Sequence, residues 1–245
     1  MRVSLFVSCL VDAFWPDVGV GTVELLRRVG CEVEFDARQT CCGQPAYNTG
    51  YRDEARRVAL CAIDVLAESS AEAIVVPSGS CAAMLKHSVG LFEEGDPAQD
   101  RARHVGERVH ELSSFLVDVL GVTDVGARFD GKLVWHDACH GLRDLGIEDQ
   151  PRALLRAVQG VELVEAQGDP TCCGFGGTFS VKQPEVSVAM LDQRLETLRA
   201  SGADAIVSSD VSCLMQLSGR LQNSTGTAVP RALHLAEVLA STEAR

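Results

Sequence analysis

The residues of this chain with the clearest capacity for chemistry are its cysteines. Eight of the ten fall into two sets of four: Cys9, Cys41, Cys42 and Cys81, and then Cys139, Cys172, Cys173 and Cys213. In the two sets, 31 and 32 residues separate the first cysteine from an adjacent pair, and 38 and 39 residues separate that pair from the last cysteine. Because the matching spacings agree within one residue, the sequence indicates a duplicated unit with four thiols in each copy.

A set of four thiolates can hold a tetrahedral zinc ion or an iron–sulfur cluster. Structural zinc sites usually take their thiolates from short Cys-x-x-Cys segments, and this chain has none. Successive side chains point apart, so an adjacent pair suits several metal atoms better than one ion. We therefore expect iron–sulfur clusters of the [4Fe–4S] type at the eight cysteines, with zinc as the alternative at one or both sites.

The other two cysteines, two histidines and a glycine-rich run need a separate interpretation. Cys31 opens a predicted strand and Cys61 lies in a predicted helix, and for both we expect packing in the core, where a free cysteine behaves as a small hydrophobe. His136 and His140 flank Cys139 and could ligate metal, relay protons or serve the structure alone. The run GFGGTF at 174–179 lacks the third glycine of a dinucleotide fingerprint, so it predicts a close-packed loop over the metal site.

Composition excludes several classes of protein. The formal net charge of −12 argues against binding to nucleic acid or to an anionic membrane surface. No apolar run approaches the roughly 20 residues that cross a bilayer, so no transmembrane segment is expected. The N-terminal apolar stretch is interrupted by Asp12 and reads as a strand rather than an export signal. We expect a cytoplasmic protein, in which clustered cysteines stay reduced and bind metal instead of forming disulfides.

The elements that position the cysteines alternate between strands and helices in both halves. Strands are predicted near 2–8, 31–36, 73–77, 131–136, 161–165 and 204–208, and helices near 18–29, 52–68, 108–120, 151–159, 184–200 and 230–240. This alternation predicts an α/β fold of two pseudo-symmetric units with mainly parallel sheets flanked by helices. The predicted domains are 1–124 and 125–245, and the polar stretch 93–107 is predicted to be an exposed loop or the start of a helix.

The predicted strands bring each set of thiols to one place. Cys9 and Cys139 come just after a strand, and Cys81 and Cys213 come shortly after another. Ligands of an open α/β sheet gather outside the carboxyl ends of its strands, where the loops converge. We therefore expect the four thiols of each set to meet at one edge of their sheet.

These motifs resemble the lactate utilisation protein A (LutA/YkgE) family, whose two cysteine-rich CCG domains are like those found in heterodisulfide reductase. The segments that carry the resemblance cover most of the chain: CCGQPAYNTGY (41–51), PSGSCAAMLKH (77–87), WHDACHGLRDLGI (135–147) and CCGFGGTFSVKQPEVSVAM (172–190). The resemblance implies an iron–sulfur electron-transfer subunit that helps to oxidise L-lactate to pyruvate. It also implies two partners, a LutB-like iron–sulfur protein and a LutC-like protein, so this chain would be an oxidoreductase subunit rather than a self-sufficient enzyme.

The chain departs from the heterodisulfide reductase pattern at two positions. That pattern ends each motif in Cys-x-x-Cys, and here Ser78 and Asp210 stand in place of the additional thiols. Their oxygen atoms are candidate extra ligands. The departure disfavours an unusual five-thiol cluster, and with it disulfide reduction, which stays an alternative function beside a glycolate oxidase subunit and a zinc-braced interaction subunit.

Overall fold

The computed structural model describes residues 1–223 and 230–242, and its core is a pair of matching parallel sheets. The first sheet has the order β2 (Glu32–Glu34), β1 (Arg2–Leu5), β3 (Ala73–Val76), β4 (Val109–Glu111). The second has the order β6 (Gln159–Val164), β5 (Arg128–Trp135), β7 (Ala205–Ser208), β8 (Arg231–His234). All pairings are parallel. The predicted α/β class with a repeated unit is confirmed.

The central strands are short apolar runs covered on both faces. All four residues of β3, AIVV, are buried, and so are all four of β7, AIVS. Such uninterrupted apolar runs are typical of parallel strands that have helices on both sides. Each central strand therefore fixes the position of the segment that follows it, and those segments carry the last cysteine of each set.

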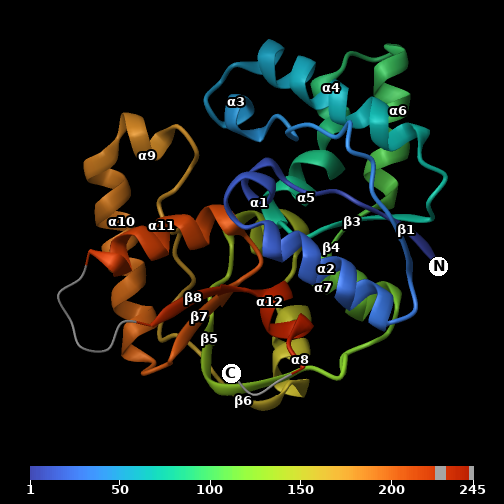
Figure 1. Cartoon of the computed structure of the whole chain (residues 1–245). Coiled ribbons are helices and arrows are strands. Elements are labelled where there is room, and N and C mark those ends of the chain that lie inside the picture. Colours follow the sequence, from blue (N-terminus) through green and yellow to red (C-terminus); the bar gives the residue numbers. More distant parts are fainter. Residues whose placement is uncertain (224–229, 243–245) are drawn as a thin grey trace.

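The helices surround both sheets (Figure 1). Those of the first half are α1 (Cys9–Phe14), α2 (Pro16–Arg28), α3 (Gln44–Asn48), α4 (Arg52–Glu68), α5 (Gly79–Lys86), α6 (Pro97–Arg108) and α7 (Leu112–Ser114). Those of the second half are α8 (Asp149–Ala157), α9 (Phe179–Lys182), α10 (Pro184–Ala200), α11 (Val211–Gln222) and α12 (Leu235–Ala240). The predicted helices 52–68 and 184–200 are confirmed as α4 and α10. No helix among the described residues is long and apolar enough to span a membrane.

Several predicted boundaries are wrong. The segments predicted as helices at 108–120 and 230–240 begin with the edge strands β4 and β8. Each edge strand is short, and its last residue, Glu111 or His234, turns the chain into a helix by capping the helix N-terminus with its side chain. The stretch 93–107 contains most of α6, and α5 and α11 were not predicted.

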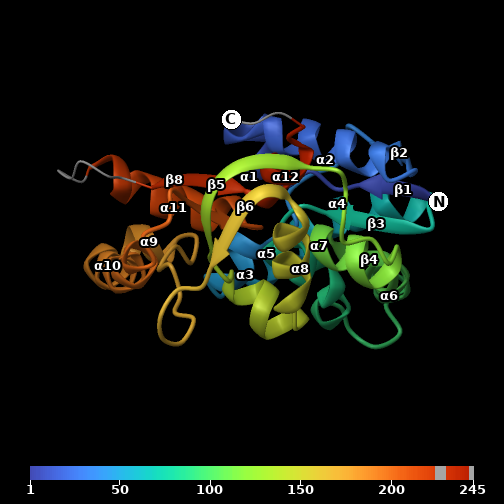
Figure 2. The ribbon, with the colours of Figure 1, turned by 90° about the horizontal axis from the view of Figure 1, so that it is seen from below.

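One of the hydrophobic clusters contains residues from both halves. This cluster of buried side chains includes Leu25 and Phe115 from the first half and Trp135 and Leu239 from the second. Helices α2 and α12 pack so closely that a Cβ atom on Gly21 would lie 3.2 Å from that of Ala240. In Figures 1 and 2 the two sheets lie on different sides of the molecule, with α5 near the middle in both views. Each sheet comes from one side of residue 124, and the domain boundary there stays a prediction.

Candidate metal centre

The cysteines at the ends of each set lie where central strands end. Cys9 is the first residue of α1, just after β1, and Cys81 lies in the first turn of α5, just after β3. Cys139 and Cys213 follow β5 and β7 in the same way. In both sheets these two strands are neighbours in the middle of the sheet. The strand that follows the first of them lies at one edge (β2 or β6), and the strand that follows the second lies at the opposite edge (β4 or β8). Such a switch point is where open parallel sheets bind their ligands.

Each adjacent cysteine pair is followed by a glycine whose backbone is in the left-handed conformation. Gly43 has φ 88° and Gly174 has φ 79°. A Cβ atom at Gly43 would lie 2.7 Å from the carbonyl oxygen of Ala55, and one at Gly174 would lie 2.4 Å from that of Ser187. Only glycine allows both the backbone and this close approach. The N–H groups of the two glycines donate to the sulfurs of Cys41 (3.5 Å) and Cys172 (3.3 Å).

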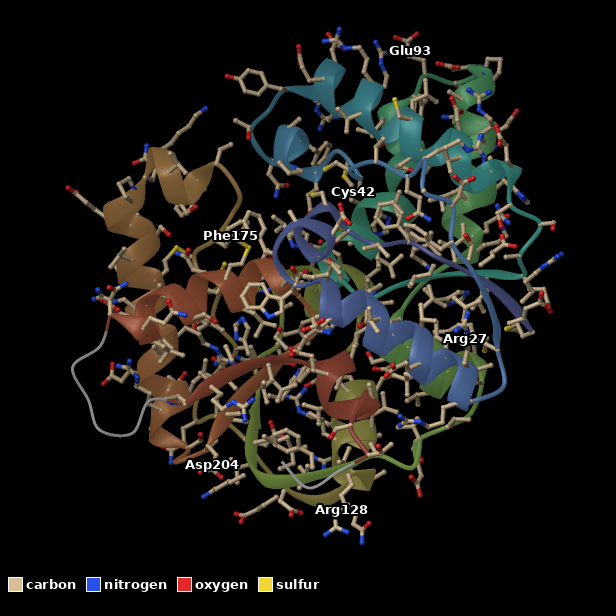
Figure 3. The ribbon with its side chains drawn as sticks, viewed as in Figure 1. Arg27, Cys42, Glu93, Arg128, Phe175 and Asp204 are labelled. Atoms are coloured by element: carbon tan, nitrogen blue, oxygen red, sulfur yellow. The ribbon has the colours of Figure 1, made fainter. Side chains whose placement is uncertain are left out.

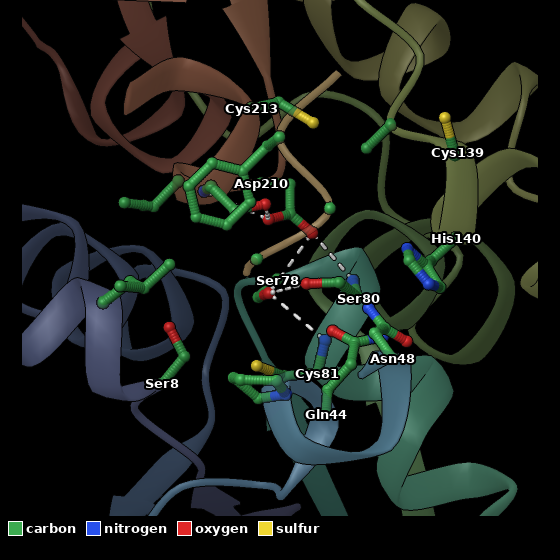
Figure 4. Close-up of a pocket in the computed structure, with 18 of the residues that line it drawn as sticks. Ser8, Gln44, Asn48, Ser78, Ser80, Cys81, Cys139, His140, Asp210 and Cys213 are labelled. Atoms are coloured by element: carbon green, nitrogen blue, oxygen red, sulfur yellow. Dashed lines mark hydrogen bonds between the residues drawn. The ribbon is translucent and has the colours of Figure 1, made fainter. Parts of the chain in front are cut away.

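The structure brings together the eight predicted cysteines. In the first set the sulfurs of Cys9 and Cys41 are 3.7 Å apart, and those of Cys42 and Cys81 are 3.4 Å apart. In the second set the sulfurs of Cys173 and Cys213 are 3.2 Å apart. All eight cysteines line a single cavity of about 340 Å³ between the two halves, and Figure 4 shows Cys81, Cys139 and Cys213 around it.

The remaining two cysteines lie away from this cavity. Cys31 is buried, as predicted. Cys61 is exposed on α4, where its sulfur contacts the carbonyl oxygen of Arg57 at 3.4 Å, so the prediction that it packs in the core is wrong. Position 61 lies next to the buried Ala62 but on the outer face of the helix.

One thiol of each set has a lowered pKa and therefore ionises more readily than a free cysteine. Hydrogen bonds from Cys42 and Cys9 lower the pKa of Cys41, and the N–H of Gly43 adds to this effect. Cys139, Cys173 and the N–H of Gly174 lower the pKa of Cys172 in the same way. Since a thiolate is the form that binds metal, each set offers a first ligand at the first cysteine of its adjacent pair.

Ser78 and Asp210 lie together between the two sets. Each caps the N-terminus of the helix that carries the last cysteine of its set: Ser78 accepts from the N–H of Cys81, and Asp210 accepts from the N–H of Ser212. Asp210 also accepts from the N–H of Ser80 at 2.8 Å and from the Ser78 hydroxyl at 3.4 Å, as the dashed lines in Figure 4 show. In this structure their oxygens serve hydrogen bonds that join the two halves, and ligation by either stays a prediction.

A buried histidine approaches the second set. His136 is fully buried, and its Nδ1 accepts a hydrogen bond from Nε of the buried Arg194 at 3.0 Å. A ring nitrogen of His136 and the sulfurs of Cys173 and Cys213 lie within 4.8 Å of one another. Burial, and then the Arg194 charge, lower the pKa of His136 to about 3, so the ring is neutral. His140 lines the cavity, and its Nε2 lies 4.0 Å from Asp144.

Arg194 is a functional residue that the sequence motifs do not predict. The buried positions of α10 are Ser187, Leu191, Arg194, Leu195 and Leu198. An arginine within a stripe of otherwise small or apolar residues is a signal of a buried polar partner, because a charged side chain is almost never buried without one. His136 was noted for its position, but only the structure pairs it with Arg194.

The cavity walls are largely apolar. Leu10 and Val181 line it, and Phe175 stands beside the second set; Figure 3 shows Phe175 and Cys42 near the middle of the molecule. The segments that follow the two adjacent pairs also contact each other, since the hydroxyls of Thr49 and Thr178 are 2.7 Å apart.

Comparisons with known proteins agree with this duplicated site. The family described as the cysteine-rich CCG domain matches the chain twice, at residues 3–86 and 133–218. Proteins named lactate utilization protein A are similar over nearly the whole chain. The one from Exiguobacterium sp. is 47% identical, covering 97% of this chain and 96% of the relative. The one from Bacillus subtilis is 44% identical, covering 98% of this chain and 100% of the relative. The cysteine-rich domains indicate metal or iron–sulfur binding.

Proposed function

This chain belongs to the lactate utilization protein A family and carries the cysteine-rich CCG domain twice, and we propose that it is an iron–sulfur electron-transfer subunit for the oxidation of L-lactate to pyruvate. The observation that carries the proposal is that all eight cysteines of the two sets line one cavity. Two metal sites that share one cavity suit electron transfer between them. Two metals with only structural roles would have no need of a shared cavity.

The residues present fit an iron–sulfur group. Each set supplies four thiols, the usual protein ligands of such clusters. Cys9, Cys41, Cys42 and Cys81 would hold one cluster, and Cys139, Cys172, Cys173 and Cys213 the other, both of the [4Fe–4S] type. A bound cluster supplies reversible one-electron transfer. The chain itself provides N–H donors at Gly43 and Gly174, which stabilise negative charge on sulfur, and a largely apolar cavity lining.

The electron count suits two sites. Oxidation of L-lactate to pyruvate releases two electrons and two protons, and a hydride acceptor such as flavin or nicotinamide usually takes them first. The sequence of this chain contains no dinucleotide fingerprint. The proposal therefore assigns the hydride step to a partner, and assigns to this chain the onward transfer of both electrons through its two sites.

The partners in this proposal are a LutB-like iron–sulfur protein and a LutC-like protein, and the location is the cytoplasm. The support for a reducing compartment is that eight of the ten cysteines form the two sets, and metal binding at these sets requires reduced thiols. Disulfide reduction has less support, because Ser78 and Asp210 occupy the positions of the additional thiols and are engaged with each other.

Zinc is a second candidate because of the sulfur separations. Two thiolates on one tetrahedral zinc ion, each about 2.3 Å from the metal, lie about 3.8 Å apart. The separations of 3.7 Å for Cys9 and Cys41 and 3.4 Å for Cys42 and Cys81 come near this value. Zinc at one or both sets would make the chain a braced interaction subunit instead of an electron carrier.

The test of function is reduction of the loaded protein by substrate. The chain is reconstituted with iron and sulfide and mixed anaerobically with its LutB-like and LutC-like partners. L-Lactate should then bleach the visible absorbance of the mixture by more than it bleaches the two partners alone, while glycolate, the alternative 2-hydroxy acid, should not. If dithionite bleaches the protein but L-lactate with both partners does not, a role in lactate oxidation is contradicted.

A further inference from the structure

The internal repeat allows the two sites to be compared position by position. The buried residues of α4 are Ala55, Ala59, Ala62, Ile63 and Leu66, and those of α10 lie 132 positions later in every case. Ala62 therefore corresponds to Arg194. The cysteines Cys9 and Cys139 are related by 130 positions, so Phe6, which directly follows β1, corresponds to His136, which directly follows β5. The first half has Phe6 and Ala62 where the second has His136 and Arg194.

The hydrogen bond from Arg194 fixes where the proton of His136 lies. A guanidinium group only donates hydrogen bonds, so Nδ1 of His136 must be the acceptor and carries no proton. A neutral imidazole has one proton, which is then on Nε2. Nε2 has no hydrogen-bond partner among the described residues, although it is buried. A buried donor without a partner is costly and points to a group that completes it.

The cysteine sulfurs of the second set are hydrogen-bond acceptors that lie close to the ring of His136. The sulfurs of Cys173 and Cys213 are 3.2 Å apart and lie within 4.8 Å of a ring nitrogen of His136. A metal-ligating histidine usually donates its other N–H to an oxygen, and so keeps a lone pair for the metal. His136 shows the opposite arrangement: the lone pair of Nδ1 is used on Arg194, so the ring has an N–H to donate at Nε2 and no lone pair left for a metal.

We propose that His136, oriented by Arg194, donates an N–H···S hydrogen bond to the cluster thiolates of the second set, and that this bond makes the second set the more easily reduced of the two. The proposal rests on the proposed iron–sulfur function. Adding one electron to a cluster increases the negative charge on its thiolates, so a fixed N–H donor stabilises the reduced form more than the oxidised form. No proton moves in this step, and in a titration the electron comes from dithionite.

Exchanging the paired residues between the halves tests the proposal. In the reconstituted full chain, the double variant His136→Phe/Arg194→Ala gives the second set the residues of the first. We expect about a tenfold decrease in its reduction equilibrium constant, which is about 59 mV for one electron. The midpoint of the first set should not move. The reciprocal variant Phe6→His/Ala62→Arg should raise the midpoint of the first set, and His136→Gln, which keeps an N–H donor, should retain part of the native value.

The outcomes separate this proposal from the proposed function. Midpoints are assigned by paramagnetic resonance in chains that keep only one set, through Cys42→Ser or Cys173→Ser. If both sets hold iron and neither exchange moves a midpoint, the proposal is overturned while the iron–sulfur function stands. Absence of iron contradicts the function instead. Nitrogen-15 spectra of histidine in zinc-loaded protein then test the hydrogen-bond donor alone: a proton on Nε2 of His136 supports it, and a proton on Nδ1 or a metal-bound nitrogen overturns it.

Discussion

The carboxylate of Asp210 accepts a hydrogen bond from the backbone N–H of Ser80 at 2.8 Å, although the two residues are 130 positions apart in the sequence. Ser80 lies in the first turn of α5, which carries Cys81, and Asp210 caps α11, which carries Cys213. A single buried carboxylate thus holds together the two helix N-termini that position the last cysteine of each set.

Replacing Asp210 with alanine should therefore destabilise the protein more than the loss of a helix cap that does not bridge the two halves. The change leaves the buried N–H of Ser80 without its acceptor and removes the cap of α11, with an expected cost of about 2–4 kcal/mol in the free energy of unfolding. Asp96→Ala is the matched control, because Asp96 caps α6 through the N–H of Ala98 without bridging the halves. Its cost should be about 1 kcal/mol. Equal costs, measured by denaturant unfolding, would contradict the bridging role.

Loss of one thiol should empty one site and leave the other loaded. Cys42→Ser should halve the iron content, because the buried Cys42 belongs to the first set alone. Cys173→Ser should halve it through the second set. Cys61→Ser is the control, since Cys61 is exposed on the outer face of α4 and should not change the metal content. A chain that loses all its iron on either buried change would show that the two sites do not bind independently.

Gly43→Ala should disturb the first site through a steric clash. Gly43 and Gly50 have the same φ of 88°, but a Cβ atom at Gly43 would lie 2.7 Å from the carbonyl oxygen of Ala55, while one at Gly50 would meet nothing within 4 Å. Gly50→Ala should cost only the left-handed backbone strain, about 1–2 kcal/mol. Gly43→Ala should cost more and should lower the affinity of the first set for metal. Thermal unfolding and metal titration of the two variants separate these effects, and identical behaviour would refute the role of the close approach.

The stability of the protein should fall as the pH rises toward neutrality because of Glu111. Burial raises the pKa of this carboxyl from 4.5 to about 7, the negative charge of Asp210 adds to the shift, and hydrogen bonds from Ser113 and Ser114 oppose it. The folded state therefore binds a proton more tightly than the unfolded state. Its contribution is complete below about pH 4.5 and is lost up to about pH 7, for a total of about 3 kcal/mol.

The comparison for this prediction is Glu111→Gln, which cannot ionise. The difference in unfolding temperature between the native protein and the variant should shrink or change sign from pH 5 to pH 8, with the native protein losing stability. Parallel pH profiles for the two proteins would show that Glu111 does not titrate as its burial indicates.

Much of this site could be predicted from the sequence because its geometry follows local rules. Helix α4 has a polar face and an apolar buried stripe, so its periodicity predicts the bounds that the structure shows. The convergence of the cysteines followed from the rule that parallel strands present ligands at their carboxyl ends. Helix α5 was missed because Gly79–Leu85 is buried on all sides and has no polar face. A uniformly apolar helix carries no amphipathic signal.

The contacts between the halves could not be predicted in the same way. The bond between Ser80 and Asp210 depends on how two repeated units dock, which no local pattern encodes. The exchange of Phe6 for His136 is visible once the repeat is aligned, but its meaning depends on which ring nitrogen meets Arg194. The direction of a hydrogen bond is a property of the folded structure.

The most direct test of the iron–sulfur assignment is the iron and acid-labile sulfide content of the anaerobically prepared protein, measured with its zinc content. Two [4Fe–4S] groups correspond to about eight iron atoms and about eight sulfides per chain, with half of each lost in Cys42→Ser. A colourless protein that contains no iron or sulfide after reconstitution, and about two zinc ions per chain, would contradict the account.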